Sequence, residues 1–121
     1  DMRTYLIAAA AAMCIAAPMA ATAEPATVTG ELITIMCYTG HGEEGHGPDH
    51  AECSLKCAKE GYPLAVLTAD GVMYKLTGHL TADDNVSLQA MLTRKVVAKG
   101  EAGREGEGHT LDASSVQLVT P

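Results

Sequence analysis

The alternation of apolar and polar residues along the chain predicts a mainly β protein. Residues 27–38 (TVTGELITIMCY) are rich in β-branched side chains and begin with the period-two alternation of a half-buried strand. Two further apolar runs, residues 63–69 and 72–77, flank the dipeptide Asp70-Gly71. Because this dipeptide favours a two-residue turn, the two runs predict a β-hairpin.

The C-terminal part of the chain predicts two more strands. Residues 95–99 and 110–119 contain β-branched and apolar residues in strand-like patterns. The segment between them, residues 100–108, holds four glycines and four charged residues. This composition predicts a mobile hairpin loop that joins the last two strands.

Two segments between the predicted strands have the signals of short helices. Asp49 with Glu52 three positions later forms a capping-box pattern, and Gly61 provides a stop signal. Thr81 with Asp84 predicts the start of a second helix in the same way. The apolar residues expected on the buried side of this second helix are Val86, Leu88, Met91 and Leu92.

The order strand, helical insert, strand, strand, helix, strand, strand resembles the OB-fold, a five-stranded barrel with a helix between strands three and four. The resemblance covers nearly all of residues 24–121 and rests on the element order, the long first strand and the glycine-rich segment between the last two strands. It implies one mainly β domain, with a short Cys/His-bearing helix inserted between strands one and two. The segment 37–76 is also similar to small secreted bacterial proteins of unknown function, which implies no activity.

The N-terminal residues 1–23 have the pattern of a secretory signal peptide. Arg3 precedes an alanine-rich apolar stretch, and Ala21-Thr22-Ala23 is a small-residue cleavage site. The stretch is too short for a firm transmembrane anchor. We therefore expect a mature domain of residues 24–121 in a bacterial periplasm or outside the cell, with no stable membrane insertion after cleavage.

Charge and composition narrow the classes of function. The formal net charge is −7, and the chain contains neither Phe nor Trp. Such a chain lacks the basic surface and the stacking side chains of nucleic-acid-binding proteins, so we expect no nucleic-acid partner. No Ser/His/Asp pattern, phosphate-binding loop or paired-carboxylate spacing stands out, so we expect no enzymatic activity.

The strongest chemical signal is a cluster of potential metal ligands. His50, Cys53 and Cys57 lie at positions i, i+3 and i+7, which places them within an arc of roughly 60° on a helix. Together with Cys37 they make up a Cys3His set, a composition that binds zinc or copper(I), as a structural ion or as cargo. Two histidines of the glycine-rich segment 40–48 are further candidate ligands: His41 and His46.

The same cysteines allow two other interpretations. The expected mature chain holds three cysteines, so one disulfide would leave one thiol over. A disulfide between Cys53 and Cys57, or between Cys37 and either of them, would brace a protein-interaction module that binds a periplasmic partner without metal. A small thiol–disulfide redox factor is the third interpretation, and it requires a lowered thiol pKa.

Overall fold

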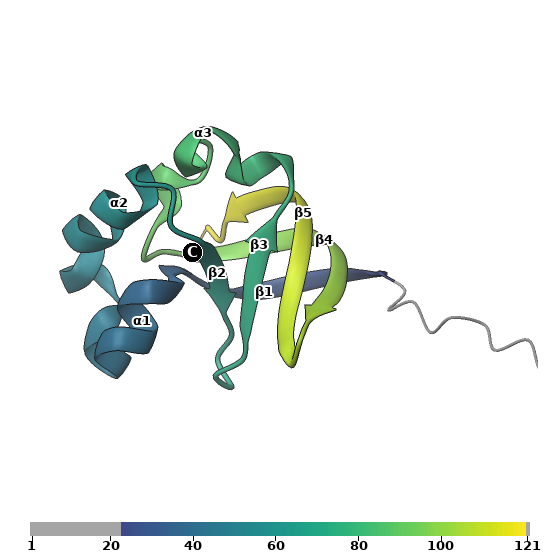
Figure 1. Ribbon diagram of the computed structural model, residues 1–121, viewed down its shortest axis with the longest axis horizontal. Coiled ribbons are helices and arrows are strands. Elements are labelled where there is room, and N and C mark those ends of the chain that lie inside the picture. The colour runs from purple at the N-terminus through teal and green to yellow at the C-terminus, as the bar shows by residue number, and fades with distance from the viewer. Residues whose placement is uncertain (1–22, 121) are drawn as a thin grey trace, which may run out of the picture.

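The computed structural model describes residues 23–120. Five strands in this range close into a barrel (Figure 1). The strand order is β1-β2-β3-β5-β4, with β3 and β5 parallel and the other neighbouring pairs antiparallel. This arrangement confirms the predicted mainly β, OB-like barrel. The strands are β1 (Glu24–Thr34), β2 (Leu64–Leu67), β3 (Met73–Thr77), β4 (Lys95–Glu105) and β5 (Gly108–Leu118).

The predicted signal peptide, residues 1–23, lies outside the described residues except for Ala23. Within residues 23–120, no helix is long and apolar enough to cross a membrane.

The barrel interior is filled by aliphatic side chains from all five strands. Leu32 of β1, Val66 of β2 and Leu111 of β5 are fully buried. Burial of a side chain of this size stabilises the fold by about 1.5–3 kcal/mol. The remaining buried members of this core are Val28, Ala58, Leu64, Leu76, Leu88, Leu92, Val96, Ala98 and Ala113.

The two hairpins differ in how well the sequence predicts them. The turn at Asp70-Gly71 joins β2 and β3 as predicted, and Gly71 has a φ of +87°. The predicted mobile loop 100–108 is wrong, because β4 and β5 pair as far as Glu105 and Gly108. Gly100 stands at an irregularity where a Cβ atom would overlap the β5 backbone. The glycine there permits close approach of two strands.

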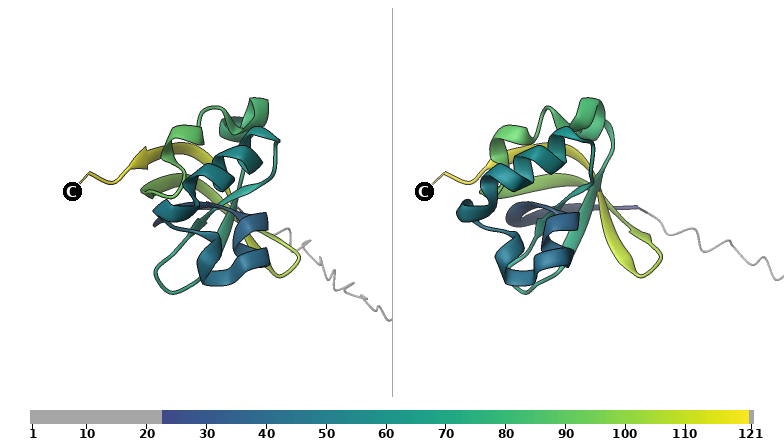
Figure 2. Two further views of the ribbon diagram at one scale, coloured as in Figure 1. Left: turned by 90° about the vertical axis from the view of Figure 1, so that its left-hand side faces the viewer. Right: turned by 60° about the vertical axis from the view of Figure 1, so that its left-hand side comes forward.

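A helical insert of residues 35–63 connects β1 to β2. It comprises two helices and two 3-10 turns, which are α1 (Ile35–His41), η1 (Gly42–Gly45), η2 (Pro48–His50) and α2 (Ala51–Lys59). The insert leaves and re-enters the sheet at one rung, because Thr34 and Leu64 are register partners. Its helices lie together on one side of the barrel (Figure 1, Figure 2).

The start of the insert corrects the prediction of a strand over residues 27–38. The strand ends at Thr34, and Cys37 lies on α1 instead of at a strand end. The pairing strand β2 starts only at Leu64, directly after Pro63. The backbone N–H of Ile35 still donates to the carbonyl oxygen of Pro63 at 3.1 Å. Proline has no N–H to give in return, so the ladder ends here and the chain coils into a helix.

The predicted capping box of α2 is also wrong. Asp49 lies inside the turn η2, which begins at Pro48, and the helix starts at Ala51 after His50 without a side-chain cap hydrogen bond. The predicted stop is confirmed, because α2 ends at Lys59 and Gly61 follows with a φ of +87°.

The chain between β3 and β4 does not form the regular helix predicted from Thr81. It contains the short elements η3 (His79–Thr81), α3 (Ala82–Asn85) and η4 (Gln89–Met91). Asp83, Asp84 and Asn85 all have positive φ, which breaks helical continuity. The buried Asn85 amide donates to the carbonyl oxygens of Ala58 and Tyr62, both at 3.0 Å.

These hydrogen bonds to the end of α2 fix the backbone around Asn85 and prevent the regular helix that the sequence pattern after Thr81 predicts. Leu88 and Leu92 still reach the core as predicted, Met91 packs partly buried against it, and Val86 is 59% exposed.

Candidate metal centre

Three cysteine side chains from the two helices of the insert converge on one point. Cys37 comes from α1, whereas Cys53 and Cys57 lie one turn apart on α2. The Sγ atom of Cys37 is 3.9 Å from that of Cys53 and 3.7 Å from that of Cys57. All three sulfur atoms lie within 4.8 Å of one another. The structure therefore brings together the three predicted thiol ligands.

The distances between the sulfur atoms fit a bound metal ion. Metal–sulfur bonds of about 2.3 Å in tetrahedral geometry place two sulfur atoms about 3.8 Å apart. A disulfide needs about 2.05 Å between the two sulfurs. Within residues 23–120, Cys37, Cys53 and Cys57 are all free thiols. The arrangement suits coordination without rearrangement of the helices.

The three thiols differ in their access to solvent. Cys37 is only 4% exposed, Cys57 is half-buried and Cys53 is exposed. On the other side of α2, Ala58 and Leu55 pack into or against the barrel core. The site thus lies at the boundary between core and solvent, and it opens to solvent at Cys53.

Mutual contact and burial raise the pKa values of Cys53 and Cys57, which favours the protonated form of both thiols. Hydrogen bonding with Cys37 is the main cause that raises the pKa of Cys53 above its usual value. Burial, with smaller effects from Cys37, raises the pKa of Cys57 to about 11. A redox-active cysteine needs a lowered pKa, so the electrostatics oppose the thiol–disulfide interpretation. A metal ion, in contrast, displaces the protons directly.

His50 lies next to the cysteines in sequence but outside the group of mutually close ligand atoms. It precedes the first residue of α2, and its ring is 5.9 Å from that of His41 between centroids. The Nε2 atom of His50 is buried and has no hydrogen-bond partner among the described residues. A buried imidazole nitrogen without a partner is costly, and a metal ion would satisfy it.

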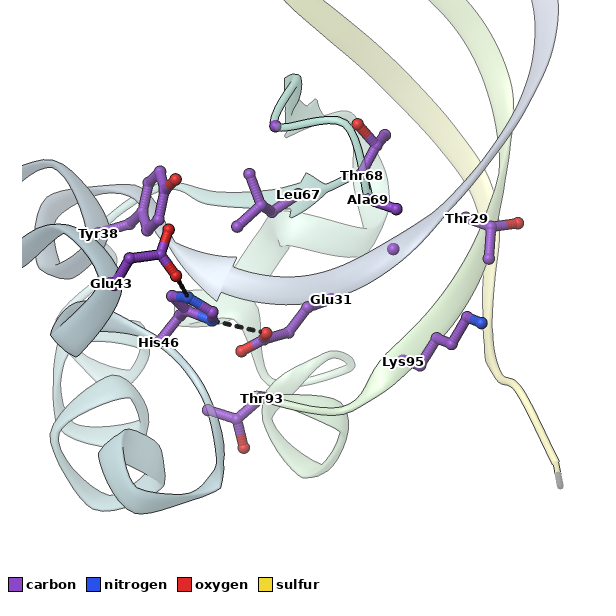
Figure 3. Close-up of a pocket in the computed structure, with 12 residues that line it drawn as sticks. Thr29, Glu31, Tyr38, Glu43, His46, Leu67, Thr68, Ala69, Thr93 and Lys95 are labelled. Atoms are coloured by element: carbon purple, nitrogen blue, oxygen red, sulfur yellow. Dashed lines mark hydrogen bonds and ion pairs between the residues drawn. The ribbon is translucent and has the colours of Figure 1, made fainter.

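His46 has partners of its own. Its Nδ1 atom lies 2.8 Å from a carboxylate oxygen of Glu31 in β1, and its Nε2 atom lies 3.0 Å from Glu43 in η1 (Figure 3). Glu31 also accepts a hydrogen bond from the backbone N–H of Gly47 at 2.6 Å. The hydrogen bonds to Glu43 and Glu31 raise the pKa of His46. The structure therefore places this predicted ligand between two carboxylates, within hydrogen-bond distance of both.

Sequence reasoning did not find the Glu31–His46–Glu43 bridge. Glu31 and His46 are separated by 15 positions and belong to different elements. The i, i+3 spacing of Glu43 and His46 was the one local signal, and such pairs occur on many exposed turns. The bridge borders an open pocket of about 710 Å³ between the insert and the barrel wall (Figure 3).

No protein-family model, no curated protein and no solved structure matches this chain.

Proposed function

We propose that this protein binds one zinc or copper(I) ion through Cys37, Cys53 and Cys57, in the periplasm or outside the cell. The convergence of three free thiols at sulfur–sulfur distances of 3.7 and 3.9 Å carries the proposal. Thiolate ligands favour both ions over the hard cations magnesium and calcium. The predicted signal peptide, residues 1–23, supports the location.

The number of ligands differs between the two ions. Zinc in protein sites is almost always four-coordinate, so it needs a donor besides the three sulfurs. His50 is the candidate for that donor, because its Nε2 atom is buried without a partner among the described residues. Copper(I) is a soft ion that three thiolates can hold without His50.

The exposure of Cys53 favours exchangeable cargo over a structural ion. An incoming thiolate from a partner protein can form a bond to the ion at this open side before the bond to Cys53 breaks. The ion keeps its oxidation state, the incoming thiol releases its proton to solvent, and the Cys53 sulfur takes one up. The barrel core does not include the three cysteines, so the fold has its own source of stability.

Metal titration of the reduced protein tests the proposal. Native mass spectrometry and elemental analysis should find one zinc or copper(I) ion per chain. Serine at Cys37, Cys53 or Cys57 should weaken binding by at least about tenfold each. His79→Ala is the matched control for adventitious binding by histidine, because His79 lies on η3 outside the insert. Absence of bound metal, or wild-type affinity in all three serine variants, would overturn the proposal.

X-ray absorption on the loaded protein identifies the ligands. A zinc site completed by His50 should show three sulfur ligands and one nitrogen ligand, and His50→Ala should lower zinc affinity. A copper(I) site should show three sulfur ligands, and the same substitution should leave copper(I) affinity unchanged.

A further inference from the structure

The strongest structural feature outside the cysteine cluster is the Glu31–His46–Glu43 bridge. It ties the insert to the barrel, because Glu31 belongs to β1 and His46 follows η1. Glu31 and His46 are each 22% exposed in their side chains, whereas Glu43 is 87% exposed. The contact between His46 and Glu31 is therefore shielded from solvent, whereas the contact between His46 and Glu43 is largely exposed.

One residue, Gly45, connects the bridge to the backbone of the metal centre. Gly45, which precedes His46, is buried against the backbone of Cys37. A Cβ atom at Gly45 would overlap the carbonyl oxygen of Cys37. His46 also meets the ring of Tyr38 edge-on, with 5.5 Å between centroids. A movement of the His46 segment would therefore displace α1, the helix that carries Cys37.

We propose that His46 is a positioning residue for the metal centre, which holds Cys37 opposite Cys53 and Cys57 by clamping the turn η1 to β1. This inference rests on the proposed metal-binding function. The geometry supports this inference because Cys37 is the only one of the three described thiols outside α2. The position of α1 therefore sets the distances from the Cys37 sulfur to the sulfurs of Cys53 and Cys57.

The bridge also makes the positioning dependent on pH. Only a protonated imidazole can donate from both ring nitrogens at once, and both nitrogens of His46 face carboxylates. Glu43 and Glu31 accordingly raise the pKa of His46. The other titratable side chains that line the same pocket are Tyr38 from α1 and Lys95 from β4 (Figure 3). When His46 loses one of its two ring protons, the nitrogen that carried it becomes an acceptor. This nitrogen then faces a carboxylate, which is also an acceptor, so one hydrogen bond is lost and the clamp weakens.

Cobalt(II) titrations of the reduced protein test the inference, with the cobalt–thiolate absorbance as the readout. H46Q should bind about tenfold more weakly than the wild type near pH 6, and E43Q about threefold more weakly. Both deficits should shrink as the pH rises through the raised pKa of His46, because the wild-type clamp then loses its proton. E44Q is the matched control, because it removes the same charge from the same turn and Glu44 has no ion pair among the described residues.

Each outcome of this experiment is decisive. Equal affinity of H46Q, E43Q and the wild type at every pH would overturn the inference and leave the proposed function intact. A deficit that does not change with pH would also overturn it, because a merely structural role would give that result. If the wild type binds no cobalt, the same comparison is made with whichever ion the metal titration loads, and binding of neither zinc nor copper(I) refutes the proposed function itself. If circular dichroism shows that H46Q is misfolded, the comparison of E43Q with E44Q decides.

Discussion

The Sγ atoms of Cys37 and Cys57 lie 3.7 Å apart although 20 positions separate the two residues in the chain. The helices α1 and α2 bring them together, and the turns η1 and η2 between these helices set the approach. A close pair of sulfur atoms from two helices cannot form by local structure alone.

Cys37 and Cys53 should differ in what they contribute to the metal-free fold. C37S should lower the free energy of unfolding by about 1–2 kcal/mol, because it places a hydroxyl in a buried site. C53S should leave it unchanged within about 0.5 kcal/mol, because Cys53 is exposed. Urea unfolding of both variants under reducing, chelating conditions measures the difference. Equal losses would contradict the burial of Cys37.

Metal binding should release protons and strengthen as the pH rises. The pKa of Cys57 is raised to about 11, and that of Cys53 is also raised, so both are thiols at neutral pH. Since the ion binds the thiolates, affinity should rise about tenfold per pH unit for each proton released. Zinc calorimetry in buffers of different ionisation enthalpy counts these protons. Binding without proton release would show that the thiols are not the ligands.

The His46 bridge should stabilise the metal-free protein most at low pH. Because the pKa of His46 is raised above 6.5, the folded state binds the proton more tightly than the unfolded state. The stabilisation is complete below about pH 6.5 and is lost as the pH rises through the folded-state value. The difference in unfolding free energy between wild type and H46Q should be about 0.5–1 kcal/mol near pH 6 and should fall toward pH 9.

Chemical denaturation at several pH values gives this difference directly. A difference that grows with pH would have the wrong sign and would show that His46 is not held as a cation.

Gly45 should tolerate no side chain. In G45A the new methyl group must displace the Cys37 backbone, so metal affinity should fall about tenfold and stability by about 1–3 kcal/mol. G40A is the matched control, because a Cβ atom at Gly40 meets no described atom within 4 Å. Titration and thermal unfolding of the two variants should separate them clearly. Similar behaviour of both would argue against the close contact between η1 and α1.

Removal of the metal should leave the barrel folded. Its buried core, which the strands supply together with Ala58, Leu88 and Leu92, contains none of the three cysteines. A chelator should therefore abolish metal binding with little change in far-ultraviolet circular dichroism, whereas L111A should cost about 2–5 kcal/mol of stability. Cooperative unfolding on chelation, as in zinc fingers, would instead identify a structural ion.

Local signals in the sequence were enough to predict the barrel strands and part of the site. The Asp70-Gly71 turn places β2 and β3 together because its backbone preference is intrinsic to those two residues. The spacing of Cys53 and Cys57 predicts a shared helix face for the same reason. Both features depend on residues that are close in sequence.

Features that depend on distant partners could not be predicted in this way. The strand β1 stops at Thr34 because its partner strand begins only after Pro63. The helix expected after Thr81 is broken because Asn85 bonds to the end of α2. The Glu31–His46 pair joins two elements whose contact exists only in the folded chain.

The rung formed by Thr34 and Leu64 has a consequence for the history and design of this protein. Because both ends of the segment 35–63 meet there, this segment is topologically a hairpin connection between β1 and β2. Exchange of this segment would keep the strand pairing of the barrel, provided that the replacement again fills the core position of Ala58. Relatives with this scaffold but other chemistry would then differ mainly between these two residues.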